Sequence, residues 1–298
     1  MIPNSIIKHQ PVMLATALTQ LQVKPGVWYI DATLGYAGHT LAMIEAGASV
    51  IGFDWDQTAV DHVTQTHPDL IAQNRLLVFH EAYSQMETIV RSLDQNIQDR
   101  IVGVLFDLGT SVPQLTSSQH GLSFSADGPL DMRMSPKKQG VTAADLLIFM
   151  SQKELTQVLR DFGGETDAVK LARAIKTSPE PIKTTGQLVA IIERVKHRTG
   201  KLHPATKVFQ ALRIAVNSEL DHLSSTLPQA LSLLDSGGRI VTIAFHEGED
   251  RIAKHTFRDW EHQKLGINIS KHPLTPSLTE IALNPRSHSA KLRTFEKL

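Results

Sequence analysis

Short apolar runs alternate with helical patterns through the first hundred or so residues of the chain. Four of these runs are rich in β-branched and aromatic residues and predict buried strands: Val27–Ala32, Ser49–Phe53, Arg75–Phe79 and Ile101–Phe106. Stretches with helical patterning, such as Thr40–Ala46 and Tyr83–Leu93, lie between them. Strands that alternate with helices in this way are typical of a parallel, doubly wound α/β sheet.

The pattern changes after the fourth predicted strand. Leu108–Gly140 is rich in Ser, Gly, Pro and Asp without a sustained period, which predicts a long loop. Helical periodicity then returns in three segments: Thr142–Phe162, Asp167–Thr177 and Thr185–His197. Thr142 is the expected N-cap of the first segment, and Thr184 or Thr185 that of the third.

The last third of the chain returns to the sheet. A strongly amphipathic helix follows His203-Pro204 and is expected to end near Leu220. Arg239–Phe245 is an apolar strand after a glycine turn, and the tail contains a last strand. The prediction is therefore a discontinuous α/β domain, residues 1–110 and 206–298, with a helical insertion, residues 111–205.

The amino-acid composition excludes several kinds of covalent and metal site. The 298 residues include no cysteine, which excludes disulfides, thiolate zinc sites and cysteine-ligated iron–sulfur clusters. The sequence shows no secretion signal and no apolar run of membrane-spanning length, so we expect a cytoplasmic protein without membrane contact. The oligomeric state, including a homodimer, stays open.

Charge is balanced overall but uneven along the chain. Thirty Lys and Arg residues match thirty Asp and Glu residues, so contact with nucleic acid must use local patches. Between Arg194 and Arg213 every charged residue is basic, and a second basic cluster spans Arg286–Arg293. These segments are candidate RNA contacts; a solvated helix face is the alternative for the first.

A loop that contains two glycines follows the first predicted strand. It runs from Asp31 to His39 and opens the next helix, where backbone N–H groups suit a nucleotide-like ligand. Gly35 and Gly38 do not complete the dinucleotide fingerprint, so a pyrophosphate cradle is disfavoured. Asp54 ends the second strand, where a carboxylate can accept both ribose hydroxyls. An ordinary turn and a helix cap are the alternatives, but together the features predict a cofactor that contains adenosine.

Polar residues also follow the fourth predicted strand. Asp107 stands where open α/β sheets bind ligands and can accept a hydrogen bond from an exocyclic amino group, while Gln114 can hold cofactor or base. A turn-capping role is the alternative for Asp107. In the long loop beyond, Phe124 can stack on a base and Arg133 can hold a phosphate, unless the segment is a structural Ω-loop.

His246-Glu-Gly-Glu-Asp250 concentrates histidine and carboxylates and therefore suggests a metal site. The spacing is not that of a helical H-E-x-x-H motif, and no second ligand cluster is evident. Hydrogen bonding at the end of a strand is expected there, without a metal.

Five blocks together resemble one known family. They are Asp107-Leu-Gly with Pro113-Gln114-Leu115, Gly128–Met134, His203–Thr206, Phe209–Asn217 and Asn284–Arg286. The chain is similar in these blocks to the RsmH (MraW) family of bacterial small-subunit rRNA cytosine-N4 methyltransferases. The resemblance runs from His9 to Arg293 and departs from the family pattern at Tyr36-Ala37, Tyr83 and Glu247-Gly248.

The resemblance implies a class I, Rossmann-like, S-adenosylmethionine-dependent methyltransferase fold whose helical insertion recognises substrate. The implied cofactor site contains Ala37, Gly38, His39, Asp54, Tyr83, Asp107 and Gln114. The residues that we expect to meet RNA are Phe124, Arg133, Lys207, Arg213, Asn217, His246 and Arg286. The implied reaction is methylation of the exocyclic N4 of a cytidine in 16S rRNA, near the decoding centre of the small ribosomal subunit.

The residue pattern alone does not determine the acceptor atom or the type of reaction. A cytosine amino group is a poor nucleophile because its lone pair is delocalised, so Asp107 is expected to accept its N–H. The absence of cysteine excludes the usual route to C5 methylation, but only the resemblance selects N4 over a ribose oxygen. A nicotinamide-dependent dehydrogenase is disfavoured by the incomplete glycine pattern. An RNA-binding ribosome assembly factor with weak catalysis remains the second hypothesis, motivated by Tyr36-Ala37 and Glu247-Gly248.

Overall fold

The computed structural model describes residues 11–109, 121–198 and 203–298. Its contacts divide the chain into two units, which are described separately. The first unit contains residues 1–109 and 221–298, and the second contains residues 110–220.

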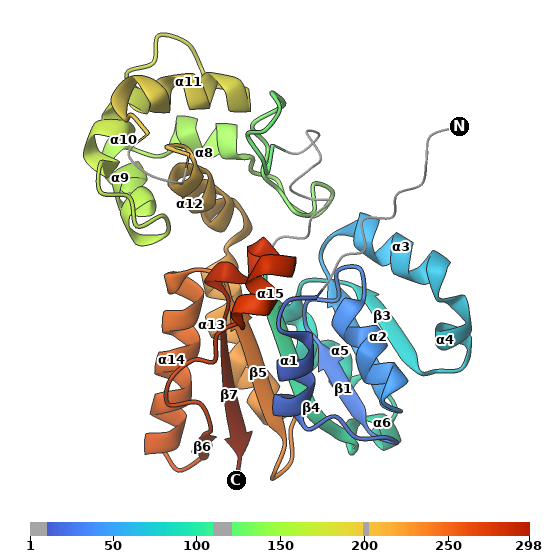
Figure 1. Cartoon of the computed structure of the whole chain (residues 1–298). Coiled ribbons are helices and arrows are strands. Elements are labelled where there is room, and N and C mark those ends of the chain that lie inside the picture. The colour runs from blue at the N-terminus through green and yellow to red at the C-terminus, as the bar shows by residue number, and fades with distance from the viewer. Residues whose placement is uncertain (1–10, 110–120, 199–202) are drawn as a thin grey trace. The chain divides into compact units, whose positions relative to one another are not determined.

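The first unit is built on a seven-stranded sheet with the order β3-β2-β1-β4-β5-β7-β6 (Figure 1). The strands are β1 Trp28–Asp31, β2 Ser49–Asp54, β3 Leu76–His80, β4 Ile101–Leu108, β5 Arg239–Ala244, β6 Gly266–Asn268 and β7 Lys291–Lys297. Neighbours among β1 to β5 pair in parallel, whereas β7 is antiparallel to both β5 and β6. This arrangement is that of class I methyltransferases and confirms the predicted fold class.

Helices of the first unit cover both faces of the sheet. The longer ones are α1 Leu14–Leu21, α2 Gly38–Glu45, α3 Gln57–Thr66, α13 Glu219–Ser232 and α14 Glu247–His262. The shorter ones are α4 Pro68–Ala72, η1 Tyr83–Gln85, α5 Met86–Arg91, α6 Gln95–Gln98, α15 Leu278–Leu283 and η3 Pro285–Ser289. All five parallel strands lie within two residues of their predicted bounds, while α1, α14 and β6 were not predicted.

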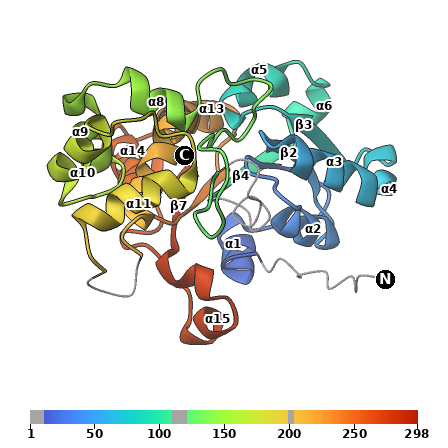
Figure 2. The same ribbon diagram turned by 90° about the horizontal axis from the view of Figure 1, so that it is seen from above.

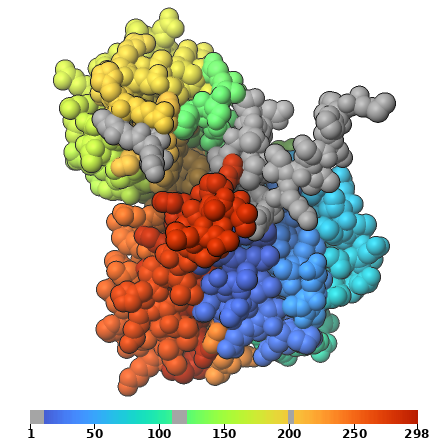
Figure 3. Space-filling model, in the orientation of Figure 1, coloured from blue at the N-terminus to red at the C-terminus, as the bar shows by residue number. Residues whose placement is uncertain are grey.

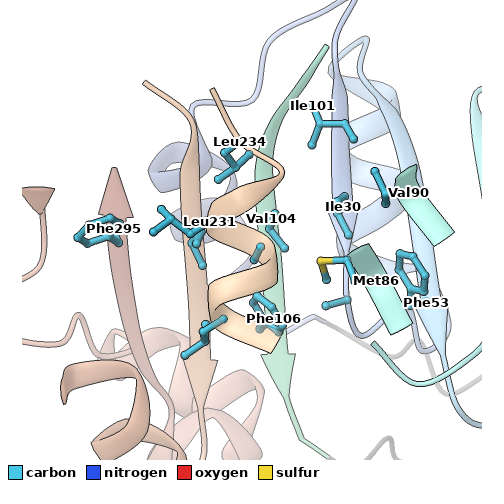
Figure 4. Packing of buried hydrophobic residues seen from close by; sticks show 14 of the residues in the cluster. Ile30, Phe53, Met86, Val90, Ile101, Val104, Phe106, Leu231, Leu234 and Phe295 are labelled. Carbon is cyan, nitrogen blue, oxygen red and sulfur yellow. The ribbon is translucent and has the colours of Figure 1, made fainter. Parts of the chain in front are cut away.

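Alternate residues of the central strands enter two different cores. Ile30, Val104 and Phe106 face α5 and α13, whose buried side chains include Met86 and Leu231 (Figure 4). Their strand neighbours Tyr29 and Leu105, together with Val241 of β5, pack on the opposite face with buried residues of α1, α2 and α3. Burial on both faces explains why these strands are nearly continuous apolar runs.

The second unit is helical (Figure 2), and its buried side chains form an apolar core of their own. Its helices are α8 Ala143–Phe149, α9 Gln152–Asp161, α10 Ala168–Lys176, α11 Thr185–Val195 and α12 Thr206–Asn217. Thr142 and Thr184 form capping boxes at the starts of α8 and α11, as their sequence context predicted. The segment predicted as one helix over 142–162 is two helices, because Ser151 forms a further capping box with Glu154.

Helix α12 changes the predicted domain boundary. It was assigned to the main domain, but Val208, Phe209 and Leu212 lie in the core of the second unit. The boundary predicted at residues 205 and 206 therefore moves to residues 220 and 221. Amphipathic periodicity identifies the buried face of a helix but not the partner that covers it.

Residues that are far apart in sequence make contacts between the N-terminal and C-terminal parts of the first unit. The backbone N–H of Met13 donates to Glu280 of α15 at 2.5 Å, and Figure 3 shows the red α15 segment against the blue atoms of α1. Among the described residues, no helix has the length and apolarity needed to cross a membrane.

A buried ion pair fixes α14 to β7. The Arg293 Nε donates to Asp250 Oδ1 at 2.7 Å, and both residues are buried. Lys291 Nζ lies 3.7 Å from the same carboxylate. Removing one partner of such a pair leaves a buried charge without compensation, which is costly.

We expect Asp250→Asn to lower the free energy of unfolding by about 3–5 kcal/mol, because Arg293 would stay buried without a counter-ion. Urea denaturation followed by circular dichroism measures this loss. Asp259→Asn is the matched control, since Asp259 and Arg258 form an exposed pair, and it should change the value by less than about 0.5 kcal/mol. Equal effects of the two substitutions would contradict the prediction.

Candidate active site

Three carboxylates meet at the carboxyl end of the sheet. Asp31 ends β1, Asp54 ends β2 and Asp107 is the penultimate residue of β4. Because β2, β1 and β4 are adjacent and parallel, the three side chains lie at one edge. The charge on Asp31 raises the pKa of both other carboxyls, after the larger effect of their burial.

Asp54 is held in place by backbone donors. The Gly35 N–H donates to its Oδ2 at 2.7 Å and the Asp56 N–H donates to its Oδ1 at 2.8 Å. Burial raises the pKa of Asp54 to about 6 against these hydrogen bonds, so the group is ionised at neutral pH. Each oxygen accepts one backbone bond and has a lone pair left, which suits two vicinal hydroxyls of a ribose.

The loop between β1 and α2 is strained at its predicted site residues. Ala37 is the N-cap of α2 and has the left-handed φ of 64°, which costs a residue with a Cβ about 1–2 kcal/mol. Gly38 follows, and a Cβ added there would overlap with the ring of Pro11. The segment that precedes α1 thus packs directly on the start of α2.

Asp107 combines burial with an unsatisfied oxygen. Its backbone N–H donates to Thr33 Oγ1 at 2.7 Å, and its side chain is 19% exposed. Burial, and then the charges of Asp31 and Glu249, raise the pKa of Asp107 to about 8. Among the described residues, no group donates a hydrogen bond to its buried Oδ1. A donor group on a ligand or substrate would satisfy this oxygen.

Aromatic rings line the neighbouring strand ends. Tyr83 makes an edge contact with Phe106 at 5.7 Å between ring centroids, and it lies 6.3 Å from His222 of α13. Trp55, which directly follows Asp54, contacts His222 at 5.2 Å. Burial lowers the pKa of His222, so its ring is neutral at pH 7. The cluster offers apolar faces beside the carboxylate of Asp54.

Comparison with known proteins assigns the chain to a family. The family model described as the MraW methylase family matches residues 6–298. The chain belongs to the MraW methylase family. The protein named ribosomal RNA small subunit methyltransferase H from Coprothermobacter proteolyticus is 39% identical, over 99% of this chain and 97% of that protein. The protein of the same name from Dehalococcoides mccartyi is also 39% identical, over 97% of this chain and 86% of its own length.

S-adenosylmethionine is the methyl donor of this fold and family, and the residues of this methylase fit it. Asp54 offers a charged acceptor to a ribose, Trp55 and Tyr83 offer ring faces, and Asp107 offers an unsatisfied oxygen. Ala37, Gly38 and His39 lie in the adjoining loop and helix start. Gln114, the remaining expected cofactor residue, lies outside the described residues.

Asn217, which is an expected RNA contact, is hydrogen-bonded inside the second unit of this methylase. It is buried, and its Nδ2 donates to the carbonyl oxygens of Met132 and Arg213, both at 2.8 Å. Its Oδ1 accepts from the Met134 N–H at 2.9 Å and from Gln139 Nε2 at 3.0 Å. Both donors and the acceptor are therefore used inside the second unit, and no capacity is left for RNA.

Several expected RNA-binding cations also have internal partners. Arg133 donates to both oxygens of Asp131 and to two loop carbonyls. Arg213 pairs with Glu219 through two bonds of 2.8 and 2.9 Å. Lys207 donates to the Gly164 carbonyl, and Lys196 pairs with buried Glu165. These contacts help to hold the second unit together, and the assignment of these cations to RNA stays a prediction.

The remaining expected RNA residues differ in their environment. Phe124 is half-buried against the rings of His203 and Phe209, at 4.8 and 5.0 Å. His246 caps α14, where its Nδ1 accepts backbone N–H bonds, as expected of a strand-end residue. Arg286 is exposed in η3, whereas Arg293 is buried in its ion pair and cannot belong to a basic surface.

Sequence reasoning missed Trp55, His222 and the structural role of Asp31. Trp55 and Asp31 each carry a local signal, since both stand at strand ends beside predicted site residues. His222 carries none, because α13 brings it to the site from a distant part of the chain.

We expect Asp54→Asn to weaken S-adenosylmethionine binding by about 10–100-fold, since a hydrogen bond to a charged acceptor contributes about 1.5–3 kcal/mol. Isothermal titration calorimetry measures the affinity. Asp61→Asn, on the exposed side of α3, is the control and should bind as the unmodified chain does. An Asp54→Asn affinity within threefold of the control would refute the ribose role.

Asn217→Ala should destabilise the second unit locally by about 1–3 kcal/mol, because buried backbone groups of the 132–134 segment lose their partners. Hydrogen exchange read by mass spectrometry should show faster exchange over residues 130–140, with the sheet of the first unit unchanged. Gln152→Ala, at an exposed amide of the same unit, should leave exchange as it was. Unchanged exchange in Asn217→Ala would contradict the structural role.

Proposed function

We propose that this methylase transfers the methyl group of S-adenosylmethionine to the exocyclic N4 of a cytidine in 16S rRNA. The single observation that carries the proposal is Asp107, a buried carboxyl with an unsatisfied oxygen at the cofactor edge of the sheet. The relatives named ribosomal RNA small subunit methyltransferase H, similar over nearly the whole chain, support the choice of RNA. The position near the decoding centre rests on the resemblance of the sequence to its family.

Methyl transfer requires the protein mainly to position the two reactants and to accept a proton. S-adenosylmethionine supplies a methyl group activated by its sulfonium charge. Asp107 accepts an N–H of the cytosine amino group, which returns electron density to the nitrogen and orients its lone pair. Asp54 and the loop that contains Gly38 fix the adenosyl end, so that the acceptor and donor meet in a fixed geometry.

RNA must reach this edge as an unpaired nucleotide, because a base within a helix does not expose its amino group to a buried carboxyl. We assign substrate recognition to the helical second unit and expect the small ribosomal subunit in the cytoplasm to be the partner. Since Arg133, Lys207 and Arg213 have internal partners, exposed cations such as Arg194 and Arg286 are better candidates for phosphate contacts.

The test is incubation of the protein with radiolabelled S-adenosylmethionine and small ribosomal subunits that lack the modification, followed by nucleoside analysis. We expect label in N4-methylcytidine. Label in another nucleoside would refute the acceptor, and cofactor binding without transfer to subunits or free rRNA would favour the assembly-factor hypothesis.

Asp107→Asn should lower the rate of transfer by about 10²–10⁴-fold while saturable cofactor binding is retained, because the amide keeps the shape but cannot take a proton. Single-turnover transfer with the same subunits measures the rate, and calorimetry measures binding. Asp61→Asn serves as the control at an exposed carboxylate. Full activity of Asp107→Asn would eliminate Asp107 as the acceptor.

A further inference from the structure

Asp107 faces His39, and a carbonyl fixes the tautomer of that histidine. The His39 Nε2 lies 3.1 Å from the Val12 carbonyl oxygen. Because a carbonyl oxygen only accepts, Nε2 must carry the hydrogen. The other ring nitrogen, Nδ1, lies 3.6 Å from Asp107 Oδ2. In neutral His39 the Nδ1 lone pair therefore faces the carboxyl group.

This geometry favours one proton between the two side chains. An ionised Asp107 beside neutral His39 places two lone pairs against each other in a buried site. A proton on either group removes the repulsion, as a carboxylic acid that faces Nδ1 or as an imidazolium that faces a carboxylate.

The described surroundings of Asp107 supply negative charge. The charges of Asp31 and Glu249 act on Asp107, beside which His39 lies; Glu249 itself accepts the Phe245 N–H and contacts His246. Among the described residues, neither lysine nor arginine forms an ion pair with Asp31, Asp54 or Asp107. Within the described part of the chain, a proton or a cationic ligand is therefore what remains to balance the charge at this edge of the sheet.

We propose that the proton of the Asp107–His39 pair and the positive charge of the cofactor replace one another. S-adenosylmethionine binds with release of the proton, and the pair takes a proton up again when methyl transfer removes the charge. The pair thereby makes the site prefer the cationic substrate over the neutral product S-adenosylhomocysteine.

The proton balance of the reaction agrees with this exchange. The methyl carbon leaves sulfur, whose electron pair stays behind as the neutral thioether, and the amine lone pair forms the new N–C bond. The amine must then lose one proton, and the Asp107–His39 pair is free to accept it because the nearby positive charge is gone. This last step rests on the proposed function, whereas the exchange on cofactor binding does not.

The direction in which the cofactor affinity changes with pH follows from this exchange. Burial and the nearby carboxylates raise the pKa of Asp107 to about 8 in the free protein, and a bound positive charge lowers it. The affinity for S-adenosylmethionine should therefore rise with pH by up to about tenfold per unit below pH 8 and level off above. S-adenosylhomocysteine lacks the sulfonium charge, so its affinity should not rise in this way.

Isothermal titration calorimetry of the full chain tests the exchange without RNA. Both cofactors are titrated from pH 6.5 to 8.5 in pairs of buffers with different ionisation enthalpies, which gives the protons released per cofactor bound. We expect S-adenosylmethionine at pH 7 to release at least half a proton more than S-adenosylhomocysteine. Equal release by the two cofactors would overturn the proposal.

Asp107→Asn is the control for titration of the cofactor's own amino group, which has a pKa near neutrality. In this variant the difference between the two cofactors should shrink to that amino-group contribution. A difference as large as in the unmodified chain would overturn the assignment to Asp107. If the variant binds neither cofactor, the comparison within the unmodified chain still decides whether the exchange occurs.

Nitrogen-15 NMR of the imidazole rings tests the part played by His39. Its signals are assigned by their loss in His39→Gln, whose amide can still donate to the Val12 carbonyl. We expect the Nε2–H tautomer in the complex with S-adenosylmethionine at pH 8. A cationic ring or the Nδ1–H tautomer there would refute the role of His39. Because no transfer to RNA is measured, failure here is distinguishable from failure of the proposed acceptor.

Discussion

Three carboxylates at the ends of adjacent parallel strands are the feature on which the rest of the site depends. Parallel pairing of β2, β1 and β4 forces Asp54, Asp31 and Asp107 to one edge. Among the described residues they have hydrogen-bond donors but no fixed cation: backbone N–H groups donate to Asp54, the Thr40 hydroxyl donates to Asp31, and His39 faces Asp107. A site of this kind attracts a cationic ligand, and the sulfonium of S-adenosylmethionine supplies that charge.

Polar residues of the second unit have a different role. They hold a helical domain together around a long irregular segment. Backbone groups in such a segment need partners when they are buried. Asn217 supplies them for Met132 and Met134, and Arg133 supplies them for the carbonyls that follow. Sequence blocks that look like RNA ligands are therefore also the residues that fold the domain.

The local features of the fold follow from the sequence. Each parallel strand is an apolar run because both faces of the sheet are covered, and Thr142 and Thr184 cap the helices that they were expected to cap. The positions of Asp54 and Asp107 at strand ends were predictable for the same reason. Such features depend on residues within one turn or one strand, so a short window of sequence contains the information.

Only the tertiary structure shows which partners the charged and polar side chains have. Arg293 was grouped with a basic tail, yet β7 brings it to Asp250 of α14. His39 was placed in the cofactor loop, but only the fold shows that Val12 fixes its tautomer and turns its Nδ1 toward Asp107. The sequence thus determined the strands, the caps and the carboxylate-bearing ends. The fold decided which charges are neutralised, because that depends on contacts between segments whose separation along the chain has no periodic signature.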